Sequence, residues 1–216
     1  MARLKPVTQR AEGVLSMAHL SFDQQSSQNE SQKMPLPKTY LQLLSTLNAD
    51  GELQMQLAEK EMPTPGPDEV LVRVEAAPIN PSDQGVMFGW SSMDKATTTG
   101  TGAETTLHAP VSPQGMRMMK ARVGQALPVG NEGCGTVVAA GENAQGLKGK
   151  LVALMGGEMY AQYRLVKAMM CLPLGPDHTA KDGAACFVNP LTALSMVETM
   201  QLEGHTALVH TAAASN

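Results

Sequence analysis

Between residues 40 and 167 the sequence is a series of short apolar runs, each ended by glycine or proline, and this punctuation limits the folds open to the chain. In residues 70–76, valines at every second position face one side of an extended segment, and the charged Arg73 and Glu75 face the other. Short strands at even spacing, with glycine turns between them, favour a closed β-barrel. The runs that we interpret as strands are residues 40–46, 53–57, 70–76, 135–140, 150–155 and 160–167.

The segments between these runs carry signals of their own. The sequence Asn48-Ala49-Asp50-Gly51 separates the first two runs and is typical of a hairpin turn. Prolines 78 and 81 end the third run, so we expect residues 80–83 to form a loop at the end of that strand. Residues 91–125 show the least pattern, and we expect a long loop there, with a helical turn in residues 116–122.

Charge and composition exclude several classes of protein. The 216 residues include 16 Lys plus Arg and 20 Asp plus Glu, so a formal charge of −4 offers no basic surface for nucleic acid. No apolar run reaches about eighteen residues, so the sequence predicts no membrane span. Three cysteines without a CxxC pair argue against a disulfide framework and fit a reducing compartment, so we predict a cytoplasmic protein.

The first 34 residues differ in composition from the rest. Residues 23–33 are almost entirely polar, and such a stretch has too little apolar surface to fold. We therefore expect residues 1–34 to be a disordered extension. Two alternatives stay open, namely an organelle-import segment and a true start at Met34.

The pattern changes after residue 180. Residues 181–188 are typical of a helix, and Asn189 followed by Pro190 predicts the cap and first position of the next one. Apolar side chains at i, i+3, i+4 and i+7 give that helix one buried stripe. Gly204 ends it, and residues 206–210 indicate a short buried strand. A helix, a glycine, an apolar strand and then small residues are how a βαβ dinucleotide-binding unit opens. The residues of the predicted stripe are Ala193, Met196, Val197 and Met200.

Five segments, in order along the chain, resemble one enzyme family. They are Pro-Gly-Pro-Asp-Glu-Val-Leu-Val at 65–72, Ala-Ala-Pro-Ile-Asn-Pro-Ser-Asp at 76–83, Gly-Asn-Glu-Gly-Cys-Gly at 130–135, Asn-Pro-Leu-Thr-Ala at 189–193 and Ala-Leu-Val-His-Thr-Ala-Ala-Ala-Ser at 207–215. Together they resemble the zinc-independent quinone-oxidoreductase and enoyl-reductase branch of the medium-chain dehydrogenase/reductases. The resemblance implies a mainly β plus α/β chain, with a GroES-like β-barrel domain at 35–175 and the start of a truncated NAD(P)-binding Rossmann-type domain at 176–216.

The resemblance also assigns residues to a site. It implies that Asn80 and Asp83 lie in the cleft near nicotinamide and substrate, whereas the residues alone favour a turn that holds its own backbone. Thr192 would approach the nicotinamide half of the cofactor from the first turn of a helix, where free N–H groups favour an anion. An ordinary first-turn threonine is the alternative. The full set implied to bind cofactor is Asn80, Asn131, Thr192, Thr211, Ala212, Ala213 and Ser215.

Metal binding is not expected. Zinc-dependent relatives carry histidine in a Gly-His-Glu motif and a cysteine at the preceding strand end. Here Asn131 stands before Glu132, and residues 80–83 contain no cysteine. Asparagine is a poor Zn²⁺ ligand beside cysteine, histidine and carboxylate.

The resemblance implies an NADPH-dependent oxidoreductase that transfers hydride to a quinone or another activated carbonyl or alkene, with NADH as an alternative cofactor. Enoyl reductases of this branch place a catalytic tyrosine near the position of Trp90, and no tyrosine lies between Tyr40 and Tyr160, which favours the quinone-reductase interpretation. The fragment alone is expected to be inactive, and the full-length form is a candidate homodimer. The alternative is a free-standing barrel that binds partners without redox activity.

Overall fold

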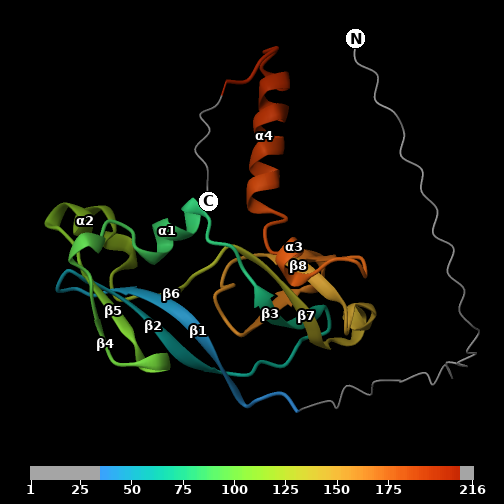
Figure 1. Ribbon diagram of the computed structural model, residues 1–216, viewed down its shortest axis with the longest axis horizontal. Coiled ribbons are helices and arrows are strands. Elements are labelled where there is room, and N and C mark those ends of the chain that lie inside the picture. The colour runs from blue at the N-terminus through green and yellow to red at the C-terminus, as the bar shows by residue number, and fades with distance from the viewer. Residues whose placement is uncertain (1–34, 210–216) are drawn as a thin grey trace, which may run out of the picture. The chain divides into compact units, whose positions relative to one another are not determined.

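The computed structural model describes residues 35–209, and the description below concerns the unit formed by residues 36–209 (Figure 1). Residues 1–34 and 210–216 lie outside the described part. The predicted N-terminal extension therefore lies outside it, as do four of the residues expected to bind cofactor. Those four are Thr211, Ala212, Ala213 and Ser215.

The strands form two five-stranded antiparallel sheets. The first has the order β4-β5-β2-β1-β6 and the second has the order β10-β8-β7-β3-β9. The first sheet comprises β1 (Thr39–Leu47), β2 (Glu52–Glu61), β4 (Thr97–Thr99), β5 (Thr106–Pro110) and β6 (Ala126–Pro128). The second comprises β3 (Glu69–Ala76), β7 (Glu132–Ala140), β8 (Leu151–Met155), β9 (Tyr163–Lys167) and β10 (Cys171–Pro173).

Backbone hydrogen bonds join the two sheets where β1 runs past the segment leading into β9. The Leu43 amide donates to the Tyr160 carbonyl (2.8 Å), and the Gln162 amide donates to the Leu41 carbonyl (3.0 Å). The predicted hairpin is confirmed, because β1 pairs with β2 from the Thr39–Glu61 pair to the Leu47–Leu53 pair. The mainly β architecture predicted from the punctuated runs is likewise confirmed.

The main core lies against β3. The pattern predicts that only every second side chain of this strand is buried, but Val70, Leu71 and Val72 are all fully buried. The cause is position, since β3 pairs with β7 on one side and β9 on the other, and register shifts next to Leu71 and Val74 bend it. The apolar core cluster around it comprises Val70, Val72, Val137, Ala144, Val152, Leu154, Met159 and Val166.

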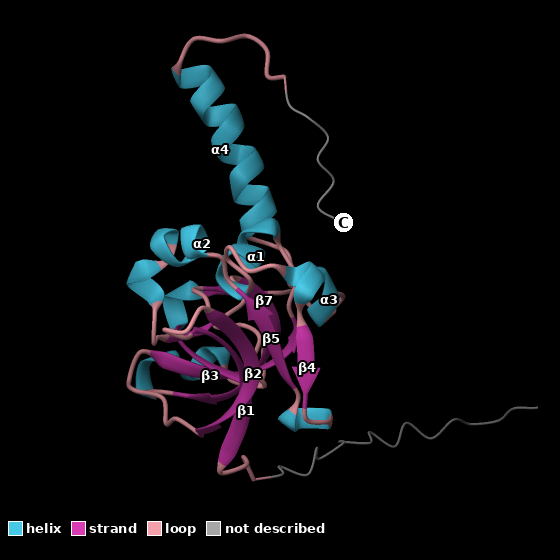
Figure 2. Ribbon diagram, turned by 90° about the vertical axis from the view of Figure 1, so that its left-hand side faces the viewer, coloured by secondary structure: helices cyan, strands magenta, loops and turns pink. Residues whose placement is uncertain are grey.

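Three short helices lie at one end of the sheets, and a longer helix extends from the same end (Figures 1 and 2). They are α1 (Pro81–Met87), α2 (Pro113–Met118), α3 (Ala180–Gly183) and α4 (Val188–Leu202). Single 3₁₀ turns occupy Met93–Lys95, Gly102–Glu104, Lys120–Arg122, Glu142–Leu147 and Ala168–Met170.

Three predictions about local structure are wrong. Residues 91–125 do not form a long loop, because β4 and β5 add to the edge of β2 and α2 follows them. The helix expected at 181–188 is shorter than predicted, because α3 spans Ala180–Gly183 and the next helix, α4, begins at Val188. Residues 206–209 are exposed and form no strand, since no other described strand pairs with them. Short apolar segments take strand geometry only when a neighbour supplies hydrogen bonds.

Glycine is required where the loop before β3 crosses the end of β7. A Cβ at Gly141 would overlap the carbonyl oxygens of Gly66 and Pro67, whereas a Cβ at Gly146, five residues along, would meet no heavy atom within 4 Å. We therefore expect Gly141→Ala to lower the free energy of unfolding by about 2 kcal/mol, because backbone must shift to admit the methyl group.

Gly146→Ala is the matched control, and it should change the free energy of unfolding by less than about 0.5 kcal/mol, or raise it. Urea denaturation of both variants checks this. Equal losses of unfolding free energy in the two variants would contradict a special requirement for glycine at position 141.

Candidate functional site

Helix α1 begins where the sequence predicts a loop. Asn80 has the extended backbone of an N-cap, Pro81 occupies the first helical position, and the Asn80 N–H donates to Oδ2 of Asp83 (2.7 Å). A cap, a proline and an acidic residue at the third position form a helix start, and proline after a strand ends that strand as well. The prediction of a loop at 80–83 is therefore wrong, because these residues form the cap and first turn of helix α1.

The Asn80 side chain is buried inside a polar network. Asn80 is 2% exposed, its Nδ2 donates to Oε1 of Glu132 (3.0 Å), and its Oδ1 accepts from Nδ2 of Asn189 (3.3 Å). The three residues come from the start of α1, the start of β7 and the start of α4. The network therefore joins three segments that lie far apart in the sequence.

The Glu132 carboxylate caps helix α4. Glu132 is fully buried, and its Oε2 accepts hydrogen bonds from the backbone amides of Phe187 (2.8 Å) and Val188 (3.0 Å). Among residues 35–209 no Lys, Arg or His side chain lies within 4.0 Å of this carboxylate. The positive end of the α4 dipole and three N–H donors therefore compensate the buried charge.

This cap corrects two expectations for α4. The helix begins at Val188, so Asn189 is its second residue and not its cap. Thr192 is the fifth residue, beyond the first turn, and its hydroxyl donates to the Val188 carbonyl (2.6 Å). Thr192 thus offers an exposed hydroxyl and no free first-turn N–H group.

Asp83 has one oxygen without a hydrogen bond. The residue is 1% exposed, and Oδ1 has no partner among the described residues. Tyr160 lies beside it, and its hydroxyl donates to the Pro78 carbonyl (2.8 Å). Burial, together with the nearby Asp83 charge, raises the pKa of Tyr160 above its usual range, so the phenol stays protonated at neutral pH.

Asn131 lies next to the network but outside it. Its Nδ2 donates to Oγ of Ser82 in the first turn of α1 (2.9 Å), and the residue is half-buried. Among residues 35–209 no three His, Cys, Asp or Glu side chains gather as metal ligands. Burial raises the pKa of the Cys134 and Cys171 thiols to about 11, so neither thiol supplies a thiolate at neutral pH.

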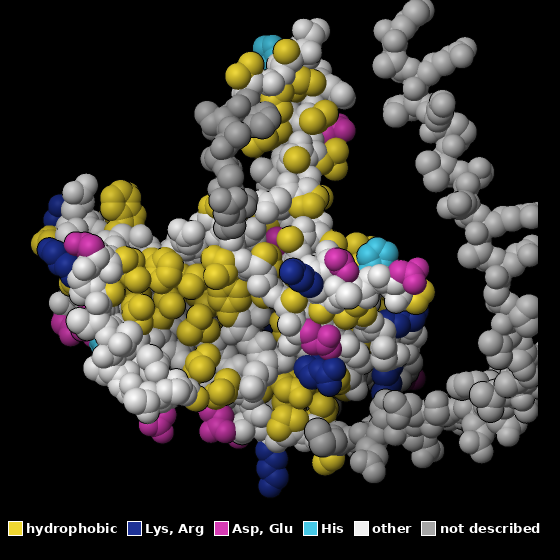
Figure 3. All heavy atoms as spheres, viewed as in Figure 1, with side chains coloured by type: hydrophobic (Ala, Val, Ile, Leu, Met, Phe, Trp, Pro, Cys, Tyr) yellow, Lys and Arg dark blue, Asp and Glu magenta, His cyan; other side chains and the backbone are white. Residues whose placement is uncertain are grey.

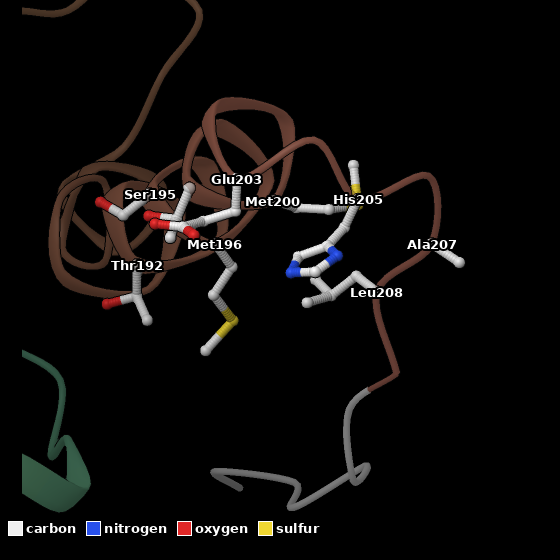
Figure 4. Close-up of a pocket in the computed structure, with 9 residues that line it drawn as sticks. Thr192, Ser195, Met196, Met200, Glu203, His205, Ala207 and Leu208 are labelled. Atoms are coloured by element: carbon white, nitrogen blue, oxygen red, sulfur yellow. The ribbon is translucent and has the colours of Figure 1, made fainter.

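Helix α4 carries apolar side chains along its exposed length (Figure 3). None of its residues is buried among the described residues, including the four of the predicted stripe. A hollow of about 490 Å³ lies between α4 and the segment that follows it. Figure 4 shows His205 and Leu208 pointing back toward Met196 on the helix, with Thr192 beside it.

The predicted site residues therefore fall into three groups. The structure places Asn80, Asp83 and Asn131 at or next to the start of α1, and it places Thr192 one turn along α4. Four others lie outside the described residues. Sequence reasoning missed the roles of Glu132 and Asn189 in the network. The signal for Glu132 was available, because a carboxylate at the start of an apolar, glycine-rich strand must find hydrogen-bond donors.

Comparison with known proteins identifies the family. Residues 66–176 match the alcohol dehydrogenase GroES-like domain, which is more than half of the chain. The chain belongs to this family, and within it to the quinone-oxidoreductase-like branch of the medium-chain dehydrogenase/reductases.

Three solved structures share the fold of this chain. A candidate NADPH:quinone reductase from Mesorhizobium loti is 30% identical over 84% of this chain and 50% of its own, with a TM-score of 0.58. A candidate NADPH:quinone reductase from Bacillus thuringiensis is 22% identical over 75% of this chain and 41% of its own, with a TM-score of 0.52. A mycobacterial protein solved with NADPH is 18% identical over 75% of this chain and 42% of its own, with a TM-score of 0.50.

The chain therefore spans half or less of the length of these relatives. A search of curated proteins returned no match. Within residues 35–209, no helix has the length and apolar character needed to cross a membrane.

The Glu132 cap predicts a local effect on the start of α4. In Glu132→Gln one side-chain oxygen becomes an NH₂ group that faces another N–H donor, so part of the network is lost. We expect the free energy of unfolding to fall by about 1–3 kcal/mol and the Phe187 and Val188 amides to exchange hydrogen faster. Hydrogen exchange measures this, and the exposed Glu142→Gln is the control. Unchanged exchange at both amides would contradict the cap.

The Asp83–Tyr160 pair predicts a shift in titration. Asp83→Asn removes the negative charge, so the pKa of Tyr160 should fall toward its usual value of about 10. A raised folded-state pKa contributes stability that is present below about pH 10 and lost above it, so this variant should lose less stability in alkali. Absorbance titration at 295 nm measures the change, with the exposed Asp94→Asn as control. Identical curves for wild type and Asp83→Asn would contradict the electrostatic coupling.

Proposed function

We propose that this chain supplies the GroES-like half of an NADPH-dependent reductase whose substrate is a quinone or another activated carbonyl or alkene. The observation that carries the proposal is the Asn80–Glu132–Asn189 network, which fixes the start of α1 against the start of α4. A hydride transfer needs its two reactants in one geometry, and a buried, hydrogen-bonded joint supplies such a geometry.

The residues around this joint suit the uncharged end of a nicotinamide cofactor. Asp83 has a buried acceptor without a donor, and Asn131 and Thr192 present amide and hydroxyl groups at accessible positions. The accessible groups of Asn131 and Thr192 would hold the carboxamide-bearing ring. When bound, NADPH supplies the hydride.

The described residues orient and shield in this proposal. Asn80 and Glu132 are fully engaged with each other and with α4, so they hold the wall of the site in place. The Tyr160 phenol stays protonated and donates a hydrogen bond to the Pro78 carbonyl, so it positions the backbone before α1. Trp90, more than half exposed at the other end of α1, stands where a tyrosine would be needed for enoyl reduction, which favours the quinone type.

Zinc independence belongs to the same proposal. The Asn131 side chain donates a hydrogen bond to Ser82, and both carboxylate oxygens of Glu132 accept hydrogen bonds from N–H groups. A carboxylate committed in this way cannot also ligate Zn²⁺ without releasing α4.

A chimera tests the function. Residues 36–204 of this chain would replace the aligned part of the Mesorhizobium loti protein, and NADPH oxidation with 1,4-benzoquinone would be followed by absorbance. We expect quinone-dependent turnover, and Thr192→Ala should lower kcat/KM by about tenfold because the exposed hydroxyl contacts cofactor.

The exposed Thr199→Ala on the same helix is the matched control and should leave kcat/KM unchanged. The 216-residue chain alone serves as a baseline, for which we expect no turnover. A folded chimera without turnover would overturn the proposal. Equal losses in the two threonine variants would remove the role of Thr192.

A further inference from the structure

The guanidinium of Arg122 makes one hydrogen bond within the described residues and has no carboxylate partner there. Arg122 ends the 3₁₀ turn Lys120–Arg122 and is half-buried, and Nη2 donates to Oγ of Ser45 (2.9 Å). Nε is buried without a hydrogen-bond partner among the described residues. No carboxylate in residues 35–209 lies within 4.0 Å of the guanidinium, and burial alone lowers the pKa of Arg122.

One side of this guanidinium has a structural role. The Ser45 hydroxyl accepts from Nη2 and donates to the Met87 carbonyl (2.8 Å), so a chain of two hydrogen bonds satisfies the end of α1. That role uses one nitrogen of three. An unpaired, partly desolvated charge is costly, and such groups persist where a ligand supplies the missing partner.

The other side of the guanidinium lines a hollow of about 350 Å³. The hollow is bounded by the C-terminal end of α1 and by the segment after α2, and its lining residues are Gly85, Gly89, Trp90, Met118, Met119, Ala121 and Arg122. A Cβ at Gly89 would lie 3.4 Å from Nη1 of Arg122 and would overlap the Met119 sulfur. The lack of a side chain at Gly89 therefore leaves space next to Nη1.

Trp90 gives the hollow an apolar wall. Its backbone is held, because its N–H points at the Met119 sulfur (3.4 Å) and Gly115 of α2 packs against it. Its side chain is nevertheless 56% exposed, and Met118 beside it is 64% exposed. An exposed aromatic ring on a fixed backbone and an exposed thioether, next to an unpaired cation, form a surface that suits a flat apolar ligand with a negative charge.

We propose that this hollow binds a planar apolar carboxylic acid, with the carboxylate on Nη1 of Arg122 and the flat body against Trp90 and Met118. As a binding site the assignment stands alone. As a statement that substrates carry such an acid group, it rests on the reductase function proposed above. The geometry supports that extension, because Asp83 lies in the first turn of α1 and Gly89 lies two residues after Met87, the last residue of the same helix.

The test uses the full chain and its only tryptophan, so fluorescence reports on this hollow alone. Sodium benzoate is titrated at constant ionic strength, with excitation at the red edge of tryptophan absorption, and benzamide serves as the uncharged isostere. We expect a saturable change with benzoate and a dissociation constant at least about tenfold weaker for benzamide, since a charge-assisted hydrogen bond is lost.

Two variants locate the charge. Arg122→Gln should weaken benzoate binding by about tenfold or more, while the exposed Arg117→Gln, which makes the same change of charge five residues away, should leave it within about twofold. Far-UV circular dichroism checks that both variants fold. If Arg122→Gln does not fold, the benzoate–benzamide comparison on the unchanged chain still decides.

Three results would overturn the proposal. They are equal binding of benzoate and benzamide, equal losses in the two arginine variants, and no saturable change with benzoate. No step of this assay uses NADPH or turnover. Benzoate binding with an inactive chimera would therefore overturn the reductase function and leave the site, whereas an active chimera without benzoate binding would do the reverse.

Discussion

The buried carboxylate of Glu132 is the interaction on which the arrangement of this structure depends. It has no cationic partner among residues 35–209, and its charge is balanced by three N–H groups and the positive end of α4. A buried ion held only by backbone and amide donors tolerates little displacement, because every lost donor exposes charge to an apolar surrounding. The start of α4 and the start of α1 are therefore held at one point on the barrel.

This constraint explains why α4 is ordered at its first turn although none of its residues is buried among the described residues. A 15-residue helix gains little stability when its apolar side chains face water on all sides. Isolated helices of that length are only marginally stable. The cap supplied by β7 offsets part of the nucleation cost. It acts from a residue more than fifty positions away, so no local sequence pattern can report it.

The same reasoning separates what the sequence could predict from what it could not. The hairpin at Gly51 and four strands of the second sheet, β3, β7, β8 and β9, correspond to short apolar runs ended by turn residues, and the structure confirms them. The fifth strand of that sheet, β10, was not predicted. Residues 97–99 and 106–110 carry no such pattern. Residues 106–110 become a strand because β2 presents an edge to them, and residues 97–99 then pair with 106–110. Residues 206–209 have the better strand pattern and form none, since no described strand lies beside them.

At the site, sequence reasoning identified the segments and misjudged their chemistry. The asparagine, proline and aspartate at 80–83 suggest a turn, and the structure makes them a helix start whose Asn80 side chain faces the core rather than an open cleft. Sequence reasoning considered Glu132 only as a possible zinc ligand beside Asn131. The partners of Glu132 are the Asn80 side chain and the backbone amides of Phe187 and Val188 at the start of α4, and a sequence does not show which backbone amides a distant carboxylate will meet.

Helix α1 thus joins two regions with opposite properties. Its N-terminal end is hydrogen-bonded to Glu132 and α4 through the Asn80 side chain, so substitutions there change folding as well as any chemistry. Its C-terminal end meets Arg122 and Trp90, where a cation is unpaired among the described residues and a ring is exposed. Tight, satisfied networks fix geometry, whereas open and partly unsatisfied ones leave room for a ligand. On that physical ground the N-terminal end of α1 fits the proposed alignment of a cofactor, and the C-terminal end fits the proposed binding of a planar acid.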